Sequence, residues 1–183
     1  MNKKVMVVML VVFTLSAMPL SGQDIMDRTR DIGITAAYWL SGDISVEGGT
    51  TEKDGSFLLR TFADFYLMPK LAMGVYFNFA PYSQNDIDVT LYEFGGSIKP
   101  KFMLDKDLAL KPGLNIGYRL SSSDLELFEI DALGLNLSVE LQKQMDNMLI
   151  HGEFGFLAQP AGGNEWADVT FAPIIYFGGG ITF

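Results

Sequence analysis

Apolar and polar residues alternate with a period of two along most of the chain. In the stretch LALKPGLNIGYRL (residues 108–120), every second position is apolar: Leu108, Leu110, Pro112, Leu114, Ile116, Tyr118 and Leu120. Lys111, Asn115 and Arg119 lie between them. A period of two predicts a β-strand with one apolar and one polar face. A soluble protein would bury the apolar face, whereas a membrane barrel would turn it toward lipid.

Seven further segments have the same alternation. The eight predicted strands are Asp31–Leu40, Phe57–Leu67, Leu71–Ala80, Val89–Phe102, Leu108–Leu120, Leu133–Leu141, Met148–Ala158 and Val169–Phe183. A strand that crosses a bilayer needs roughly 9–11 residues, and these segments meet that length. Pro112 and Pro173 each remove a hydrogen-bond donor from a predicted strand. The fourth strand changes phase near Leu91, for which we expect a β-bulge.

The connections alternate between two kinds. Short turns, MPK, LDKD and QKQMDN, follow the second, fourth and sixth strands, and longer polar loops follow the first, third, fifth and seventh. This arrangement is typical of an up-and-down meander whose two ends face different compartments. Closing the meander removes its two exposed edges. The sequence therefore predicts an all-β fold, an eight-stranded antiparallel up-and-down transmembrane β-barrel.

Side-chain size indicates which face is the inside. The interior of an eight-stranded barrel is only just wide enough for side chains to fill it, and the smallest residues share a face with the charges. These are Gly33, Gly74, Gly95, Gly113, Gly117, Gly134, Gly155, Gly178 and Gly180. We therefore expect the polar face to line the lumen. Because unpaired buried charge is costly, we expect a lumen ion-pair network of Arg60, Asp64, Glu93, Lys99, Lys111, Arg119, Glu140, His151 and Glu153.

The opposite face is nearly uniform Leu, Ile, Val and Phe, as a lipid-facing band should be. Aromatic residues on it cluster near the strand ends and predict two interfacial girdles. They are Tyr38, Phe57, Phe65, Phe102, Tyr118, Phe156, Phe171 and Phe183. Trp39 ends the first strand, where we expect it to pack.

The first residues are typical of export. MNKK is followed by a 13-residue apolar run, residues 5–17, and then by MPLSGQ. We assign residues 1–22 to a signal peptide and residues 23–183 to the barrel domain; a buried N-terminal helix is the alternative. The chain has no cysteine, which excludes disulfides, Cys-based metal sites and lipid anchoring through cysteine. Without Lys3 and Lys4, 11 basic residues stand against 22 acidic ones, a net charge of −11 that argues against a nucleic-acid partner.

Three features together resemble a known family. They are the signal peptide, the hairpin IKPKFML…LALKPGLNIGYRL and the terminus IIYFGGGITF. The chain resembles the small outer-membrane β-barrel proteins of Gram-negative bacteria, similar to the eight-stranded OmpX and OmpA-barrel group, which carry the label "porin family". The resemblance covers the whole mature chain, and we expect no peptidoglycan-binding domain after the barrel. It implies a location in the outer membrane and contact with its lipid bilayer and lipopolysaccharide. It also implies that the assembly machinery reads Phe177, Ile181 and Phe183, a series that Gly179 interrupts.

His151 is the single histidine and shares the lumen face with Glu153. This pair could belong to a lipid-modifying enzyme of the lipid A deacylase type, some of which are eight-stranded barrels. Such enzymes place a serine beside the histidine, however, and the neighbours here are Ile150 and Gly152. A structural histidine is the alternative. No P-loop, nucleotide fingerprint or HExxH site occurs, so we expect no catalytic residue, no cofactor and no metal.

The long loops are strongly acidic. They carry Asp43, Glu47, Glu52, Asp54, Asp86, Asp88, Asp124, Glu126, Glu129, Asp131, Glu165 and Asp168, with Lys53 as a basic residue. They are either a solvated surface or a site for cations or a basic partner. Trp166 is either a surface-contact anchor or a girdle residue. We expect a non-enzymatic barrel with a structural or surface-interaction role; the alternatives are the lipid-modifying enzyme and a soluble lipocalin-like ligand binder.

Overall fold

The structure is a computed structural model that describes residues 25–47, 49–84, 87–123 and 129–183. The predicted signal peptide, residues 1–22, lies outside the described residues, as do the loop acids Asp86, Asp124 and Glu126. No helix in the described part is long and apolar enough to cross a membrane.

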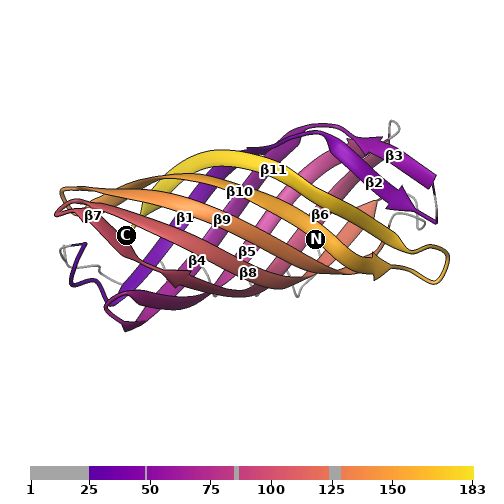
Figure 1. Ribbon diagram of the computed structural model, residues 1–183. Helices are drawn as coiled ribbons and strands as arrows, with labels where there is room; N and C mark the ends of the chain where they lie inside the picture. Colours follow the sequence, from indigo (N-terminus) through magenta and orange to yellow (C-terminus); the bar gives the residue numbers. More distant parts are fainter. Residues whose placement is uncertain (1–24, 48, 85–86, 124–128) are drawn as a thin grey trace.

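In the described part of the chain, eleven β-strands form one sheet that is rolled into a tilted barrel (Figure 1). Their bounds are β1 Arg30–Trp39, β2 Gly42–Val46, β3 Gly49–Lys53, β4 Ser56–Met68, β5 Leu71–Gln84, β6 Ile87–Pro100, β7 Phe102–Asp105, β8 Leu108–Ser123, β9 Asp131–Met145, β10 Met148–Gly163 and β11 Val169–Thr182. Three of these strands continue others. β2 continues β1, because both pair with β11. β3 precedes β4 in the same wall position, because both pair with β5. β7 continues β6, because both pair with β8. The wall therefore has the eight strands that the sequence predicts.

The barrel closes where its first strand meets its last. β1 pairs antiparallel with β11 from Gly33↔Thr182 to Trp39↔Tyr176. Beyond that ladder, Phe183 N donates to Ile32 O (2.8 Å). Every sequential wall strand is antiparallel to its neighbour. The predicted all-β, closed up-and-down barrel is thus confirmed.

The barrel has a turn end and a loop end, names that we keep below. The turn end carries the turns at 69–70, 106–107 and 146–147, where Asp146 has a φ of 53°. At the loop end the strands run further than predicted: β5 continues to Gln84, β8 to Ser123 and β10 to Gly163. The sequence hides these extensions because alternation is lost where both faces of a strand meet water.

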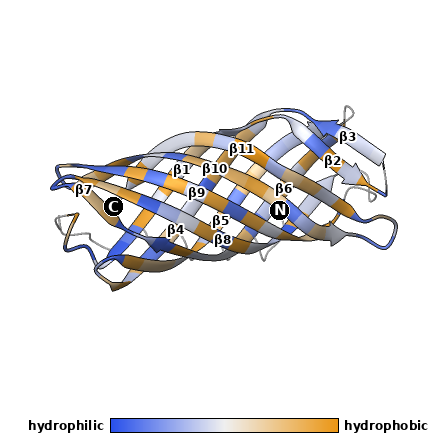
Figure 2. Cartoon of the chain, in the orientation of Figure 1, coloured by the Kyte–Doolittle hydropathy of each residue, from blue (hydrophilic) through white to orange (hydrophobic). Residues whose placement is uncertain are grey.

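Hydrophilic and hydrophobic residues alternate along the strands (Figure 2). Over most of the wall the apolar side chains are exposed on the outside and the polar ones are buried inside, as predicted. Leu114, Ile116 and Leu137 are 39%, 49% and 53% exposed, whereas Arg60 and Glu140 are 1% and 2% exposed. A soluble lipocalin-like barrel would bury the first three residues and expose the last two. The structure rules out that alternative.

Two expectations about strand phase are wrong. β6 pairs with β5 and β8 without a register shift, so there is no bulge at Leu91. Leu91 instead points inward into an apolar cluster. Phe171 is not a girdle residue: it is buried in the same cluster. The register between β10 and β11 shifts between Leu157 and Gln159, beside Pro173, and this shift reverses the phase of β11.

A row of glycines runs across the wall at one height. Gly95, Gly117 and Gly134 are direct cross-strand partners on β6, β8 and β9. A Cβ atom on Gly117 would meet the Tyr76 hydroxyl, and one on Gly134 would meet the Glu93 carboxylate. The missing side chains therefore make the room that large polar side chains occupy inside.

Candidate functional site

The lumen near the turn end is filled by a charge cluster around Lys111. Its Nζ lies 2.9 Å from Asp31 Oδ2 and 3.2 Å from Asp64 Oδ2. Lys99 Nζ lies 2.9 Å from the same oxygen of Asp64 and 3.7 Å from Glu140 Oε2. Each of these five side chains is at least nine-tenths buried. The opposite charges thus replace the water that each group loses on burial.

A second charge cluster fills the middle of the barrel. Arg60 pairs with Glu153, and Arg119 Nη2 lies 2.5 Å from Glu93 Oε2. Each of the two carboxylates also accepts a hydrogen bond from a tyrosine: Tyr76 donates to Glu93 (2.5 Å), and Tyr176 donates to Glu153 (2.6 Å). Such charge-assisted hydrogen bonds are the stronger kind.

All nine residues that the sequence analysis assigned to the lumen ion-pair network lie inside the barrel and are buried. Sequence reasoning did not include Asp31, Arg28 or the lumen tyrosines. Asp31 could have been found, because it shares the inward phase of Gly33 on β1. With Arg28 and Asp31 included, five basic and five acidic side chains form the buried ion pairs: Arg28, Arg60, Lys99, Lys111 and Arg119 with Asp31, Asp64, Glu93, Glu140 and Glu153.

His151 is sealed between two threonines. Its Nε2 lies 2.9 Å from Thr35 Oγ1, and its Nδ1 lies 3.0 Å from Thr182 Oγ1. The nearest atom of Glu140 is 3.8 Å from Nδ1. His151 is 5% exposed. Because both ring nitrogens have neighbours inside the wall, this arrangement fits a packing role better than acid–base chemistry on a substrate.

An apolar layer lies inside the loop end. Trp39, Leu58, Phe171 and Ile174 are among its buried residues, and the Lys53 ammonium sits 4.0 Å from the centre of the Trp39 ring. Lys53 donates to Leu40 O (3.1 Å) and to Asp54 O. Burial lowers the pKa of Lys53 to about 8. Sequence reasoning placed Lys53 in an open loop, because no alternation marks β3.

The residues that precede β1 fold across the turn end. Ile25 is fully buried against Ala109 and Leu149. Its backbone N donates to Gln144 Oε1 (2.6 Å), and its carbonyl accepts from Lys101 Nζ. Since Arg28 also pairs with Asp31 in the lumen, this segment covers the turn-end mouth of the barrel.

The rim of the loop end is acidic. Nine of the acidic residues that the sequence analysis assigned to the long loops are exposed in the structure: Asp43, Glu47, Glu52, Asp54, Asp88, Glu129, Asp131, Glu165 and Asp168. Lys53, the one basic residue in the described part of this rim, is buried. The rim therefore presents negative charge to solvent.

Trp166 projects from this rim and is 65% exposed. It lies in the turn between β10 and β11, which Asn164 holds. Asn164 Oδ1 accepts from the backbone N of Trp166 (2.9 Å) and of Ala167 (3.0 Å). Asn164 Nδ2 donates to Glu129 O (3.2 Å), which ties the turn to the neighbouring loop. The exposed indole thus stands on an ordered support.

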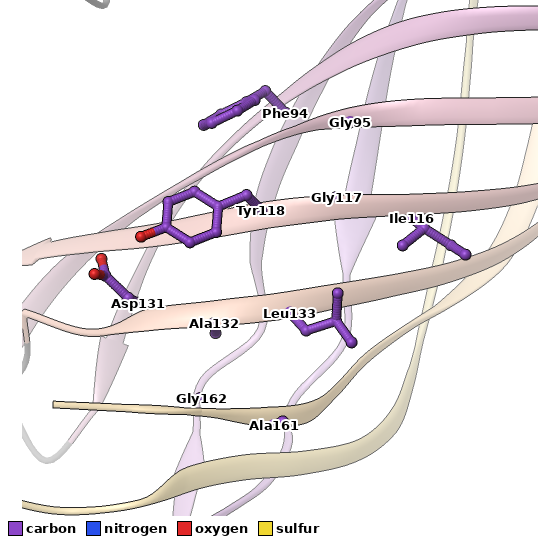
Figure 3. Close-up of a pocket in the computed structure, with 10 residues that line it drawn as sticks. All are labelled: Phe94, Gly95, Ile116, Gly117, Tyr118, Asp131, Ala132, Leu133, Ala161 and Gly162. Atoms are coloured by element: carbon purple, nitrogen blue, oxygen red, sulfur yellow. The ribbon is translucent and has the colours of Figure 1, made fainter.

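A shallow hollow of about 610 Å³ lies on the outer wall near the loop end (Figure 3). Phe94, Ile116, Tyr118 and Leu133 surround it, and the Tyr118 hydroxyl faces the Asp131 carboxylate. The wall is thin here because Gly95, Gly117 and Gly162 contribute to it. The hollow belongs to the lipid-facing surface.

Within the described residues, no three His, Asp or Glu side chains are grouped so that they could hold a metal ion.

Comparison with known proteins shows the fold. No protein-family model matches the chain, and no curated protein matches its sequence. The structure of Neisserial surface protein A is similar, with a TM-score of 0.63 and 15% identity over 85% of this chain and 96% of that one. OprG from Pseudomonas aeruginosa has a TM-score of 0.56 and 13% identity over 88% and 99%. Ail, the attachment invasion locus protein of Yersinia pestis, has a TM-score of 0.50 and 13% identity over 85% and 100%.

Proposed function

We propose, from the premise that this chain is a small OmpX-like β-barrel of the Gram-negative outer membrane, that it is a non-enzymatic scaffold whose acidic loop end contacts a basic partner at the cell surface. The observation that supports this proposal most directly is that Trp166 is exposed, although hydrogen bonds to Asn164 stabilise the turn in which it lies. Tryptophan is enriched among the hot-spot residues of protein interfaces. The name of Ail, an attachment protein with a similar fold, is in keeping with this role.

Charge defines the kind of partner. Glu165 and Asp168 lie close to Trp166 in the same turn. Asn164 of that turn donates to Glu129 O, and Asp131 begins β9 two residues after Glu129. A basic protein surface with an apolar pocket would match both the charge and the indole. Lipopolysaccharide and the assembly machinery are further proposed partners, the latter through Phe177, Ile181 and Phe183, whose place on β11 or directly after it supports the assignment.

The filled lumen supports a scaffold rather than a pore or an enzyme. The two charge clusters occupy the space through which a solute would pass, so we expect no stable conductance in a planar bilayer. His151 is closed off by Thr35 and Thr182. We therefore expect His151→Ala to leave the lipid A profile unchanged in mass spectrometry; altered lipid A would favour the deacylase alternative.

Binding to cells that display the protein tests the proposal. The probes are a fluorescent basic protein and an acidic protein of similar size. We expect the basic probe to bind, to be released by salt, and to bind several-fold more weakly to Trp166→Ala. A matched control is Phe102→Ala, which removes an exposed aromatic at the turn end. Equal binding of both probes, or no effect of Trp166→Ala, would contradict the proposal.

A further inference from the structure

The hollow on the outer wall owes its shape to a row of paired residues. Leu133 on β9 is the cross-strand partner of Tyr118 on β8 and of Ala161 on β10. The register of β9 and β10 shifts between Ala158 and Ala161, and Gly162 follows directly. Because these small residues stand next to a leucine and a tyrosine, the outer wall has a recess here, with a volume of about 610 Å³.

The hollow is polar at one end only (Figure 3). Asp131 begins β9 and has the same outward phase as Leu133, which lies two residues, or about 7 Å, further along the strand. The Tyr118 hydroxyl faces the Asp131 carboxylate, whereas Ile116 and Leu133 lie away from this pair. Among the described residues that line the hollow, Asp131 alone is charged. The lining therefore changes from polar to apolar in the direction away from the loop end.

This gradient matches a lipid molecule that stands beside the barrel. A charged side chain on the outer wall is costly in hydrocarbon, and tyrosine is enriched where the hydrocarbon meets the headgroups. Asp131 and Tyr118 therefore lie at headgroup level, while Ile116 and Leu133, which are 49% and 47% exposed, face the hydrocarbon. A headgroup at Asp131 would place an acyl chain of the same lipid on these two apolar side chains.

Charge and aromatic rings indicate which headgroup fits. The Asp131 carboxylate repels an anionic headgroup and attracts an ammonium group, which can donate charge-assisted hydrogen bonds to it. The rings of Phe94 and Tyr118, whose centroids are 5.6 Å apart, add faces that attract cations. In the described part of the chain, no lysine or arginine lines the hollow, so a phosphate finds no basic partner in it.

We propose that this hollow binds one membrane lipid whose headgroup carries a primary ammonium group. The ammonium group donates to Asp131 beside the Tyr118 hydroxyl, and an acyl chain packs on Ile116 and Leu133. Asp131 also belongs to the acidic rim, but Trp166 does not line the hollow. Trp166→Ala should therefore leave lipid binding intact, and the two proposals can fail independently.

NMR titration of the whole protein in lipid nanodiscs tests this proposal. The nanodiscs consist of phosphatidylcholine, into which phosphatidylethanolamine or phosphatidylglycerol with the same acyl chains is mixed in steps. Of these three lipids, only phosphatidylethanolamine has a primary ammonium group. We expect saturable shifts of the Leu133 and Ala161 methyl signals with phosphatidylethanolamine, and binding at least about threefold weaker with phosphatidylglycerol.

Two variants separate the carboxylate from the recess. Asp131→Asn should abolish the preference for phosphatidylethanolamine; its control is Glu165→Gln, which removes an exposed carboxylate outside the hollow and should leave the preference unchanged. Ala161→Phe should fill the recess and remove the saturable shift of Leu133. Its control is Ala36→Phe, which places the same ring at an exposed alanine outside the hollow and should leave that shift in place.

Heat-modified mobility on gels would show that each variant still folds. Shifts that rise in proportion to the lipid fraction without saturating, or equal responses to phosphatidylethanolamine and phosphatidylglycerol, would overturn the proposal. The same loss with Ala36→Phe as with Ala161→Phe would also overturn it, because the lipid would then respond to the barrel surface in general.

Discussion

The pair of Arg60 and Glu153 in the middle of the lumen offers a sharp test of the filled barrel. Arg60 is 1% exposed and Glu153 is 7% exposed. Glu153→Gln keeps the shape of the side chain but leaves the guanidinium without its counter-charge. Breaking a buried ion pair from one side costs about 3–5 kcal/mol. The amide carbonyl of the substituted side chain would still accept a hydrogen bond, so we expect a loss near the lower end of that range, about 3 kcal/mol.

The double variant Arg60→Met/Glu153→Gln separates charge from packing. It removes the unpaired charge, and Tyr176 keeps a hydrogen bond from Asn136 Nδ2 (3.1 Å). Replacing both partners of a buried ion pair is often nearly neutral. We therefore expect the double variant to lose less than half of the stability that Glu153→Gln alone loses.

Urea-induced unfolding in phospholipid vesicles, followed by tryptophan fluorescence and by the mobility of unheated samples on gels, measures both effects. Glu165→Gln at the exposed rim is the control and should change the free energy of unfolding by less than about 0.5 kcal/mol. A loss below about 1 kcal/mol for Glu153→Gln, or an equal loss for the double variant, would refute the view that the pair compensates buried charge.

Three further predictions follow from the wall, the loop end and the lipid face. Gly95→Ala should destabilise the barrel by about 1–3 kcal/mol, because its Cβ would meet the backbone of Ile116 and Gly117; the adjacent Gly96→Ala, whose Cβ would find its nearest atom 3.8 Å away, should be harmless in the same unfolding assay. Lys53 binds fewer protons when buried, because its pKa falls from 10.5 to about 8. Raising the pH from about 8 to about 10.5 should therefore strengthen closure of the β2–β3 hairpin, because the open hairpin binds a proton in this range that the closed one does not. Hydrogen exchange of the backbone amides of the β2–β3 hairpin, corrected for the pH dependence of the intrinsic exchange rates, measures this effect. If Lys53→Met showed the same pH dependence, the prediction would be contradicted. Leu137→Arg on the lipid face should cost about 2–4 kcal/mol in vesicles, and a neutral result would argue against lipid contact there.

Period-two alternation predicted most of the fold, because a bilayer-spanning strand must keep one face apolar and the other polar. The same logic placed Arg60 and Glu140 inside and Leu137 outside. It failed where that constraint ends. Leu91 and Phe171 lie near the loop end, where apolar side chains fill the lumen, so their phase gave a false bulge and a false girdle residue.

The parts of the site that depend on contacts between strands distant in sequence were not predictable. Sequence spacing cannot show that Asn164 holds the turn of Trp166. Nor could it show that Lys53 is buried over Trp39, since a lysine in a polar stretch is normally solvated. Asp31 is the exception: its inward phase was visible on the first strand.

The orientation of the two faces is tested most directly by single-cysteine labelling, because the chain has no cysteine of its own. A fluorophore attached at Leu137→Cys or Ser138→Cys, which are adjacent on β9 and point to opposite faces, is followed in vesicles that contain brominated lipids. We expect strong quenching for the label at 137, and either weak quenching or no folded, labelled protein for 138. Strong quenching at 138 with none at 137 would contradict the account.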